Sequence, residues 1–254
     1  MDARLLKILE NSCTIEHPDT SILTDEEFTA LRRNGIGASD ASVILNTMPW
    51  QTEEQLLESK LHTGPRTEAE IAIGEKETVR MGKDLEPLIL GKIQKEFNDT
   101  SIEKPRAMYR LISYPFLTVN YDAIAKTARE GYIPIEIKTI SMYGDKYYNK
   151  EQAIDPRYVL EPKNAVYATK RILWEPIGGL EERAAITGIP TYYYTQLQQQ
   201  MIPLNARYGI LAALHVKDWT LRYYFVPADQ MIQNLIAEEG YKFWKKIEKI
   251  RKGI

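Results

Sequence analysis

Residues 132–140, YIPIEIKTI, alternate between apolar and polar side chains over most of their length, and this alternation decides the fold that we expect. Successive side chains of a β-strand point to opposite faces, so Glu136 and Lys138 share one face. The alternate isoleucines share the other face: Ile133, Ile135 and Ile137. The stretch therefore predicts a strand with one face packed into a core and with an acid and a base on the opposite face.

The preceding stretch FLTVNYDAIA, residues 116–125, predicts a partner strand. Turn-like residues at 128–131 separate the two stretches, which favours an antiparallel hairpin. If the hairpin is centred on Arg129, Asp122 lies directly opposite Glu136, with about 4.5–5.5 Å between the two Cβ atoms. We therefore expect two carboxylates side by side on the polar face.

Two carboxylates this close repel each other unless a cation lies between them. Hard oxygen ligands at this spacing suit Mg²⁺ or Mn²⁺, and Lys138 is one step further along the same face. A divalent metal with a lysine that holds a water or a phosphate forms a phosphodiester-hydrolysis site. The alternative is a solvated sheet face with a surface salt bridge, and this short motif alone does not separate the two.

Helices are predicted on both sides of these strands in the sequence, from capping residues and from apolar spacing. Three short helices are expected first: one at about 24–33 that begins with Thr24 and Glu27, one with Ser39 as its N-cap, and one that begins with Thr52 and Gln55. A long helix at 67–97 follows, interrupted near Gly74, Gly82 or Pro87. The last two are a helix at 190–202 and an amphipathic closing helix at 227–252.

Strands are predicted at 107–113, 116–125 and 132–140 as three consecutive antiparallel strands, with two more at 207–216 and 221–226. Helices around a central mixed sheet place the chain in the α/β (α+β) class. Because we find no internal repeat and no low-complexity linker, we expect one domain over 1–254, with a helical part at about 1–98 and the sheet core and C-terminal helices at about 105–254.

The charge balance excludes a protein that coats DNA through a bulk positive field. The 254 residues include 33 Lys and Arg against 35 Asp and Glu, for a formal net charge of -2. With 44% hydrophobic and 10% aromatic residues, the composition is that of a folded globular chain. Any phosphate-binding charge must therefore be local.

Cys13 is the only cysteine, which excludes a disulfide framework and a four-thiolate zinc or iron–sulfur site. No run approaches the roughly 18 apolar residues of a membrane span. The N-terminal sequence MDARLLKILENS carries acids within its apolar pattern, unlike a secretory signal. We therefore expect a cytoplasmic protein.

Four segments in the same order resemble the YqaJ-like viral recombinases, the phage lambda exonuclease family of the PD-(D/E)xK nuclease superfamily. They are LRRNGIGASDASVILNTMPW at 31–50, MGKDLEPLILGKIQKEF at 81–97, LTVNYDAIA with IPIEIKT within 117–139, and YYYTQLQQQM at 192–201. One such match would be weak, whereas four in register are specific. The resemblance implies a restriction-endonuclease-like core.

The resemblance also implies a set of site residues. Two Mg²⁺ ions, or Mn²⁺, would be surrounded by Glu86, Asp122, Glu136 and the main-chain carbonyl of Ile137. Lys138 would position the attacking water, Gln196 would contact the site, and Arg32 with Ser39 would hold a 5′-terminal phosphate. The residues themselves support the last role, because a capped helix start after a glycine-rich turn binds phosphate and an arginine adds a bidentate donor.

Each assignment has a structural alternative. Glu86 would be an exposed helix carboxylate, Ser39 only a cap, and Gln196 with Gln200 a polar surface, of which the match favours Gln196 alone. The tyrosines at 143, 147, 148, 192, 193 and 194 would either stack on unpaired bases or belong to the core. The three histidines show no ligand spacing.

The sequence also departs from the family pattern. Ala123 follows Asp122 where the family usually has glycine, and the stretch between Lys138 and Gln196 is long for lambda-type members. That insertion leaves open whether the family's trimeric ring and DNA channel are retained. A Cas4-like nuclease is disfavoured because one cysteine cannot hold its cluster.

The function that we expect is a Mg²⁺-dependent 5′→3′ exonuclease that resects double-stranded DNA ends to 3′ single strands for phage-type recombination. The alternatives are an endonuclease of the same superfamily and a non-catalytic scaffold that binds DNA ends. By family analogy, we expect a homo-oligomer, a single-strand annealing protein as partner, and a phage or prophage origin within a bacterial cytoplasm.

Overall fold

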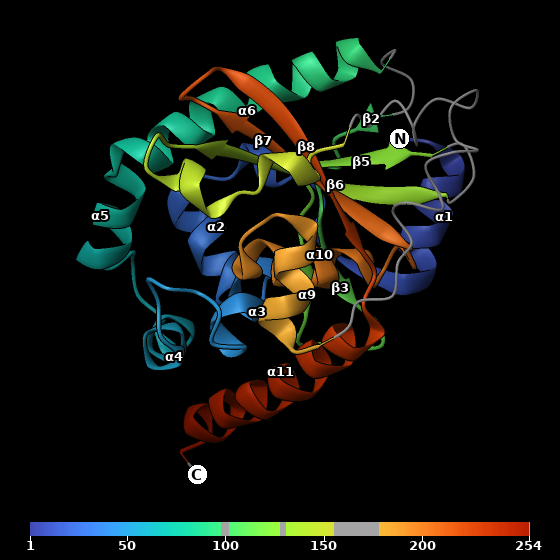
Figure 1. The fold of residues 1–254 in the computed structure, drawn as a ribbon. Coiled ribbons are helices and arrows are strands. Elements are labelled where there is room, and N and C mark those ends of the chain that lie inside the picture. The colour runs from blue at the N-terminus through green and yellow to red at the C-terminus, as the bar shows by residue number, and fades with distance from the viewer. Residues whose placement is uncertain (98–101, 128–130, 155–177, 254) are drawn as a thin grey trace.

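The computed structural model describes residues 1–97, 102–127, 131–154 and 178–253 (Figure 1). Its helices are α1 Ala3–Ser12, α2 Asp25–Arg32, α3 Ala38–Ile44, α4 Glu53–Leu61, α5 Glu68–Glu75, α6 Glu77–Glu96, α9 Leu180–Thr187, α10 Thr191–Met201 and α11 Gln230–Arg251, with short 3₁₀ turns η1 Thr20–Ile22, η2 Gly144–Tyr147 and η3 Lys150–Gln152. Its strands are β1 Cys13–His17, β2 Ile102–Glu103, β3 Met108–Leu111, β4 Thr118–Val119, β5 Ala123–Lys126, β6 Tyr132–Ile140, β7 Tyr208–His215 and β8 Thr220–Pro227.

The strands form two sheets, one of five strands in the order β2-β5-β6-β7-β8 and one of three in the order β1-β3-β4. In the larger sheet β6 and β7 are parallel, while the other neighbours are antiparallel. A parallel pair needs a crossover connection, and the chain between β6 and β7 includes α9 and α10. The predicted mixed sheet flanked by helices is confirmed.

The register of the predicted hairpin is also confirmed. Ala123 pairs with Ile135 and Ile124 with Pro134, which brings Asp122 level with Glu136. The expected centre, Arg129, lies outside the described residues. The alternate isoleucines of β6 are buried, as their shared face predicts: Ile133, Ile135 and Ile137.

The prediction of three consecutive strands in one sheet is wrong, because residues 116–125 divide between the two sheets. β4 pairs with β3, whereas β5 pairs with β6. The residues between β4 and β5 are held by contacts to other elements. The hydroxyl of buried Tyr121 donates to the carbonyl of Gln200 at 3.0 Å, and Asp122 accepts from the main chain of β6. The part predicted as helical, about 1–98, also supplies a strand, since β1 pairs with β3.

The capping boxes at Thr24 and Thr52 are confirmed at the starts of α2 and α4. The N-cap prediction for Ser39 is wrong. α3 begins two residues earlier than predicted, at Ala38, and its N-cap is Gly37, whose N–H donates to Asp40 Oδ2 at 2.8 Å. Ser39 is therefore inside the first turn.

The long helix predicted at 67–97 is two helices, α5 and α6, which meet at Lys76 near the expected break at Gly74. Pro87 lies inside α6. The closing helix α11 begins at Gln230, three residues after its predicted start, because Asp229 accepts from the N–H groups of its first turn.

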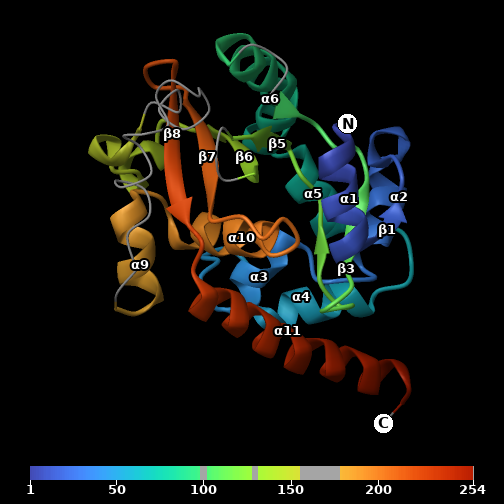
Figure 2. The same cartoon turned by 90° about the vertical axis from the view of Figure 1, so that its right-hand side faces the viewer.

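Helix α10 packs against the larger sheet, on the face that carries Glu136. Figure 2 shows it beneath the larger sheet, with α3 beside it and α11 along the base of the molecule. Buried Gln199 ties α10 to the turn before α3 and to β4 of the smaller sheet, because its Nε2 donates to the carbonyls of Ile36 and Thr118 at 2.9 Å each. α10 thus links the glycine-rich turn before α3 to both sheets.

Candidate active site

The polar face of β6 is covered and not solvated. Glu136 is only 2% exposed, although an unpaired carboxylate belongs in water. Its neighbours are glutamines of α10, which packs over this face. The alternative of an ordinary surface salt bridge is therefore excluded for Glu136.

The two oxygens of Glu136 have different partners. Oε1 accepts from Lys138 Nζ and from Gln196 Nε2, while Oε2 accepts from Gln200 Nε2 at 2.6 Å. Gln196 and Gln200 are one helical turn apart, so both reach the same carboxylate. α10 thereby fixes the orientation of Glu136 from one side.

Asp122 lies beside this pair and accepts a hydrogen bond from the Ile137 N–H at 2.8 Å. Burial raises the pKa of Asp122 to about 7, and the negative charge of Glu136 adds to the effect. The nearby Lys138 does not fully offset the two causes. The single charge of Lys138 therefore does not neutralise both carboxylates.

Lys138 is held as an ammonium ion at neutral pH. Burial by itself lowers the pKa of Lys138, but attraction to Glu136 and Asp122 outweighs this and raises it. The Nζ atom also lies 5.5 Å from the ring centroid of Tyr193. Lys138 can therefore donate hydrogen bonds to a water or a phosphate but is not a proton acceptor.

Glu86 is not brought into contact with the other two carboxylates. Its Oε1 pairs with Lys104 Nζ at 2.6 Å, although its charge still raises the pKa of Asp122. Across the described ranges, no group of three or more His, Cys, Asp or Glu side chains is gathered closely enough to hold a metal. The predicted metal role of Glu86 stays a prediction.

The donors that are present suit a hard divalent cation. Asp122, Glu136 and the main chain of Ile137 offer oxygen only, which is what Mg²⁺ and Mn²⁺ prefer. Gln200 Oε1 is buried and has no hydrogen-bond partner among the residues that the structure describes. Two repelling carboxylates and a free oxygen fit a cation that would neutralise them.

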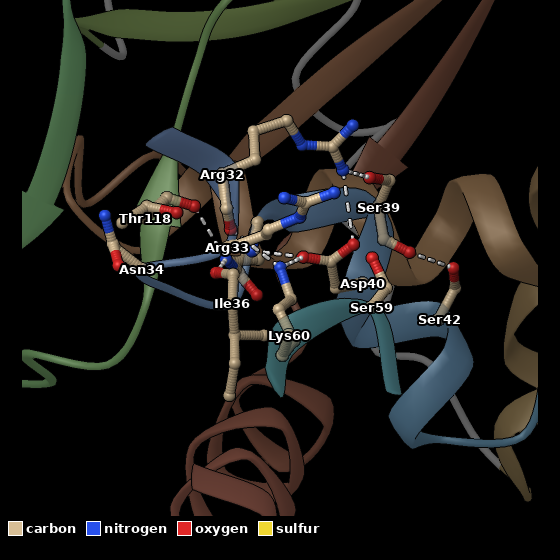
Figure 3. Close-up of polar contacts among 12 residues, drawn as sticks. Arg32, Arg33, Asn34, Ile36, Ser39, Asp40, Ser42, Ser59, Lys60 and Thr118 are labelled. Atoms are coloured by element: carbon tan, nitrogen blue, oxygen red, sulfur yellow. Dashed lines mark hydrogen bonds and ion pairs between the residues drawn. The ribbon is translucent and has the colours of Figure 1, made fainter. Parts of the chain in front are cut away.

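A second polar cluster surrounds the start of α3 (Figure 3). Arg32 Nη2 donates to Ser39 Oγ at 2.8 Å and to Asp40 Oδ1 at 3.2 Å. The side chain of Arg32 is 41% exposed, so its guanidinium remains accessible. The structure thus brings together the two residues predicted to hold a 5′-terminal phosphate.

A buried ion pair lies behind this cluster. Lys60 Nζ donates to Asp40 Oδ2 at 2.6 Å and to the carbonyl of Arg32 at 2.8 Å. Burial by itself raises the pKa of Asp40, but attraction to Lys60 and Arg32 outweighs this, so the pKa lies below its usual value. Lys60 therefore holds both the backbone of Arg32 and the carboxylate that contacts its guanidinium.

The cluster borders a cavity of about 280 Å³. Basic side chains outnumber acidic ones among its described lining residues: Arg32, Arg33, Lys60, Arg66 and Lys83 against Asp25, Asp40 and Glu70. A cavity with excess positive charge favours an anion.

Sequence reasoning missed Gln200, Asp40 and Lys60. Gln200 is 1% exposed and contacts the carboxylate that Gln196 also contacts. Its spacing of four from Gln196 was the available signal, since such residues share a helix face. Asp40 and Lys60 lie on different helices, and no local pattern relates them.

The mixed sheet, with an acid and a lysine on its central strand, defines a protein of the restriction-endonuclease-like fold. The chain matches the YqaJ-like viral recombinase domain over residues 27–204 and belongs to that family. The predicted resemblance is thereby confirmed. Across the described residues, no helix is both long and apolar enough to cross a membrane.

Individual relatives are distant. The uncharacterized protein YqaJ of Bacillus subtilis (strain 168) is 29% identical over 144 residues, which are 56% of this chain and 41% of that protein. The crystal structure of LHK-Exo in complex with dAMP has a TM-score of 0.52 and 13% identity, covering 87% of this chain and 92% of that one. The alkaline exonuclease LHK-Exo from Laribacter hongkongensis has the same TM-score and coverage at 15% identity, which shows a shared fold.

Proposed function

We propose that the chain is a metal-dependent deoxyribonuclease that removes nucleotides from the 5′ ends of double-stranded DNA. The observation that carries this proposal is the arrangement of buried Glu136 with half-buried Lys138 and Asp122 beneath α10. Burying charged groups opposes folding unless they are closely paired, and hydrophobic residues would stabilise the same place at least as well. Such a cluster is therefore best explained by a catalytic role and not by a contribution to stability.

In the proposed reaction Asp122, Glu136 and the Ile137 carbonyl would hold the cation, with Glu86 as a further candidate. When bound, Mg²⁺ would activate the water and stabilise the charge on the phosphate and the leaving oxygen. Lys138, kept protonated by its acidic neighbours, would donate hydrogen bonds that orient the water or a phosphate oxygen. Gln196 and Gln200 hold the Glu136 carboxylate in one orientation.

The cluster at Arg32 and Ser39 supports action at DNA ends. A guanidinium that is accessible and already positioned by Ser39 and Asp40 suits a phosphate dianion. LHK-Exo, which shares the fold, binds dAMP, a mononucleotide of the kind an exonuclease releases. A 5′-phosphate site in addition to a hydrolytic site favours exonuclease over internal cleavage.

The test is digestion of a linear, 5′-phosphorylated duplex by the wild-type protein and by Lys138→Ala. We expect digestion by the wild type with Mg²⁺, none with EDTA, and a loss of at least about 100-fold in rate for Lys138→Ala, since positioned groups of this kind contribute about 10²–10³-fold. Equal inactivity of both proteins would favour the alternative of a non-catalytic scaffold.

A covalently closed circular duplex separates exonuclease from endonuclease. The proposed enzyme leaves the circle intact and digests the same DNA after linearisation. Cleavage of the closed circle would instead identify an endonuclease of the same fold. Glu136→Ala should abolish digestion while DNA binding persists.

The biological setting is also part of the proposal. Resection to 3′ single strands for phage-type recombination, a single-strand annealing partner, a homo-oligomer and a bacterial cytoplasmic location follow from family membership by analogy. The match spans about 41% of the length of the Bacillus subtilis relative. We therefore propose these properties for this chain alone and do not transfer them from the whole relative. Sizing of the purified protein and co-purification with an annealing protein would test them.

A further inference from the structure

Three aromatic side chains form a continuous row that runs outward from Lys138. We call Trp50, Tyr192 and Tyr193 the aromatic row. The Lys138 Nζ lies 5.5 Å from the ring centroid of Tyr193. The Tyr193 and Tyr192 centroids are 4.5 Å apart, and those of Tyr192 and Trp50 are 4.9 Å apart.

The row comes from two distant parts of the sequence. Tyr192 and Tyr193 belong to the first turn of α10, whereas Trp50 lies in the connection between α3 and α4. Trp50 is 63% exposed, which is high for a large aromatic side chain that already contacts another ring. The outer end of the row is therefore available to a ligand.

Other tyrosines singled out in the sequence have a different role. Tyr194 is fully buried and its hydroxyl donates to Asp229 Oδ2 at 2.9 Å, while Tyr148 is 7% exposed and packs against His215. These two belong to the core. Packing in the core thus explains Tyr148 and Tyr194 but does not explain the aromatic row.

The row contacts one polar cluster and ends at a residue whose chain neighbour lines the cavity of the other. Gln51, the residue after Trp50, lines the cavity that Arg32 also lines. At the other end the row meets Lys138, which holds Glu136. The three rings therefore lead from Lys138 of the candidate hydrolytic site to Trp50, whose chain neighbour Gln51 lines the cavity at Arg32.

We propose that the aromatic row binds the nucleobase of the unpaired 5′-terminal nucleotide. This inference rests on the proposed function, because it assumes a terminal phosphate near Arg32 and a scissile phosphate near Lys138. A nucleotide joined to both phosphates carries its base between them. Aromatic side chains bind unpaired bases of any sequence by stacking, because every base has a π-face.

The flanking charges favour a nucleic acid over an apolar peptide. A cation lies at the inner end of the row, Lys138 beside Tyr193, and the residue after Trp50, Gln51, lines the cavity that Arg32 also lines. Alternation of cationic groups with aromatic rings is the pattern of single-strand binding surfaces. Stacking on the row would also favour fraying of the duplex end, since a base bound there cannot remain paired.

The experiment compares two 5′-phosphorylated duplexes that are identical except that one has an abasic 5′-terminal nucleotide. Binding is measured by fluorescence anisotropy with Ca²⁺ in place of Mg²⁺. We expect the wild type to bind the complete duplex about tenfold more tightly than the abasic one. Trp50→Ala should bind both equally, and Trp50→Phe should keep most of the difference.

Trp219→Ala is the matched control, because Trp219 is 65% exposed and lies in the turn between β7 and β8. It should retain the full difference of the wild type. The inference is overturned if the wild type shows no difference, or if Trp50→Ala retains it. A protein that digests linear duplex but shows either result keeps the proposed function and loses only this inference.

Discussion

Glu136 shows how much a single residue depends on its contacts. Its carboxylate is buried, yet every oxygen has a donor: Lys138 from the same strand and two glutamines from α10. Removing Gln200, which alone among the described residues donates to Oε2, leaves a buried acceptor unsatisfied and lets the carboxylate rotate. The orientation of Glu136 is therefore a property of α10 as much as of β6.

Gln200→Ala should weaken Mn²⁺ binding by about tenfold or more, because residues that orient metal-binding groups typically contribute 10–100-fold in affinity. Gln198→Ala is the control, since Gln198 is equally buried but binds the Pro227 carbonyl and the Asp229 N–H instead. Isothermal titration of the metal into each purified protein measures the effect. Equal affinities for the two variants would remove Gln200 from a positioning role.

Arg32→Ala should abolish the preference for phosphorylated over hydroxyl 5′ ends, because its guanidinium is the exposed donor of the Ser39 cluster. The ratio of initial digestion rates on the two substrates is the measurement. Arg106→Ala is a suitable control, since Arg106 is 67% exposed and pairs with Asp19 away from this cluster. An unchanged ratio for Arg32→Ala would contradict the phosphate role.

The starts of the helices depend partly on residues close in the chain and partly on contacts between separate elements. The capping boxes position the starts of α2 and α4 through residues three apart. The start of α3 instead depends on Asp40, which is held by Lys60 of α4. The buried pair therefore couples two helices and the backbone of Arg32.

Lys60→Met should reduce the free energy of unfolding by about 3–5 kcal/mol, because it removes the ammonium partner of the buried Asp40 carboxylate and leaves only Arg32, among the described residues, as a cation beside it. Urea denaturation followed by circular dichroism measures the change. The double variant Asp40→Asn with Lys60→Met should recover part of the loss. If Lys60→Met is as stable as the wild type, the ion pair between Asp40 and Lys60 is not formed in solution.

The whole molecule binds DNA, in our proposal, through few charged contacts. The net charge is -2, and the basic residues near the candidate site are concentrated around Arg32 and Lys138. A bulk positive field is absent from the composition. DNA affinity should therefore depend on local contacts at the end and not on coverage of the duplex.

The salt dependence of binding measures this property. With roughly three phosphate contacts, the slope of log K against log salt concentration should be about -3, since each contact contributes about -0.9. Anisotropy titrations of a 5′-phosphorylated duplex at several salt concentrations give the slope. A slope steeper than about -6 would indicate an extended basic surface and contradict the proposal.

The sequence by itself determined the features that depend on neighbouring residues. Alternation predicted the faces of β6, the hairpin expectation predicted its register with β5, and side chains three apart predicted two helix starts. These signals are local because strand faces, hairpins and caps involve residues close in the chain. The pairing of Asp122 with Glu136 followed from them.

The tertiary structure decided what depends on packing between distant segments. The division of 116–125 between two sheets, the clamp of Gln200 on Glu136 and the pair of Asp40 with Lys60 all join residues on separate elements. No period or cap relates such residues, because their contacts arise only when helices and sheets pack together. The extent of the single domain stays a prediction. The burial of Glu136 arises from the packing of α10 on β6.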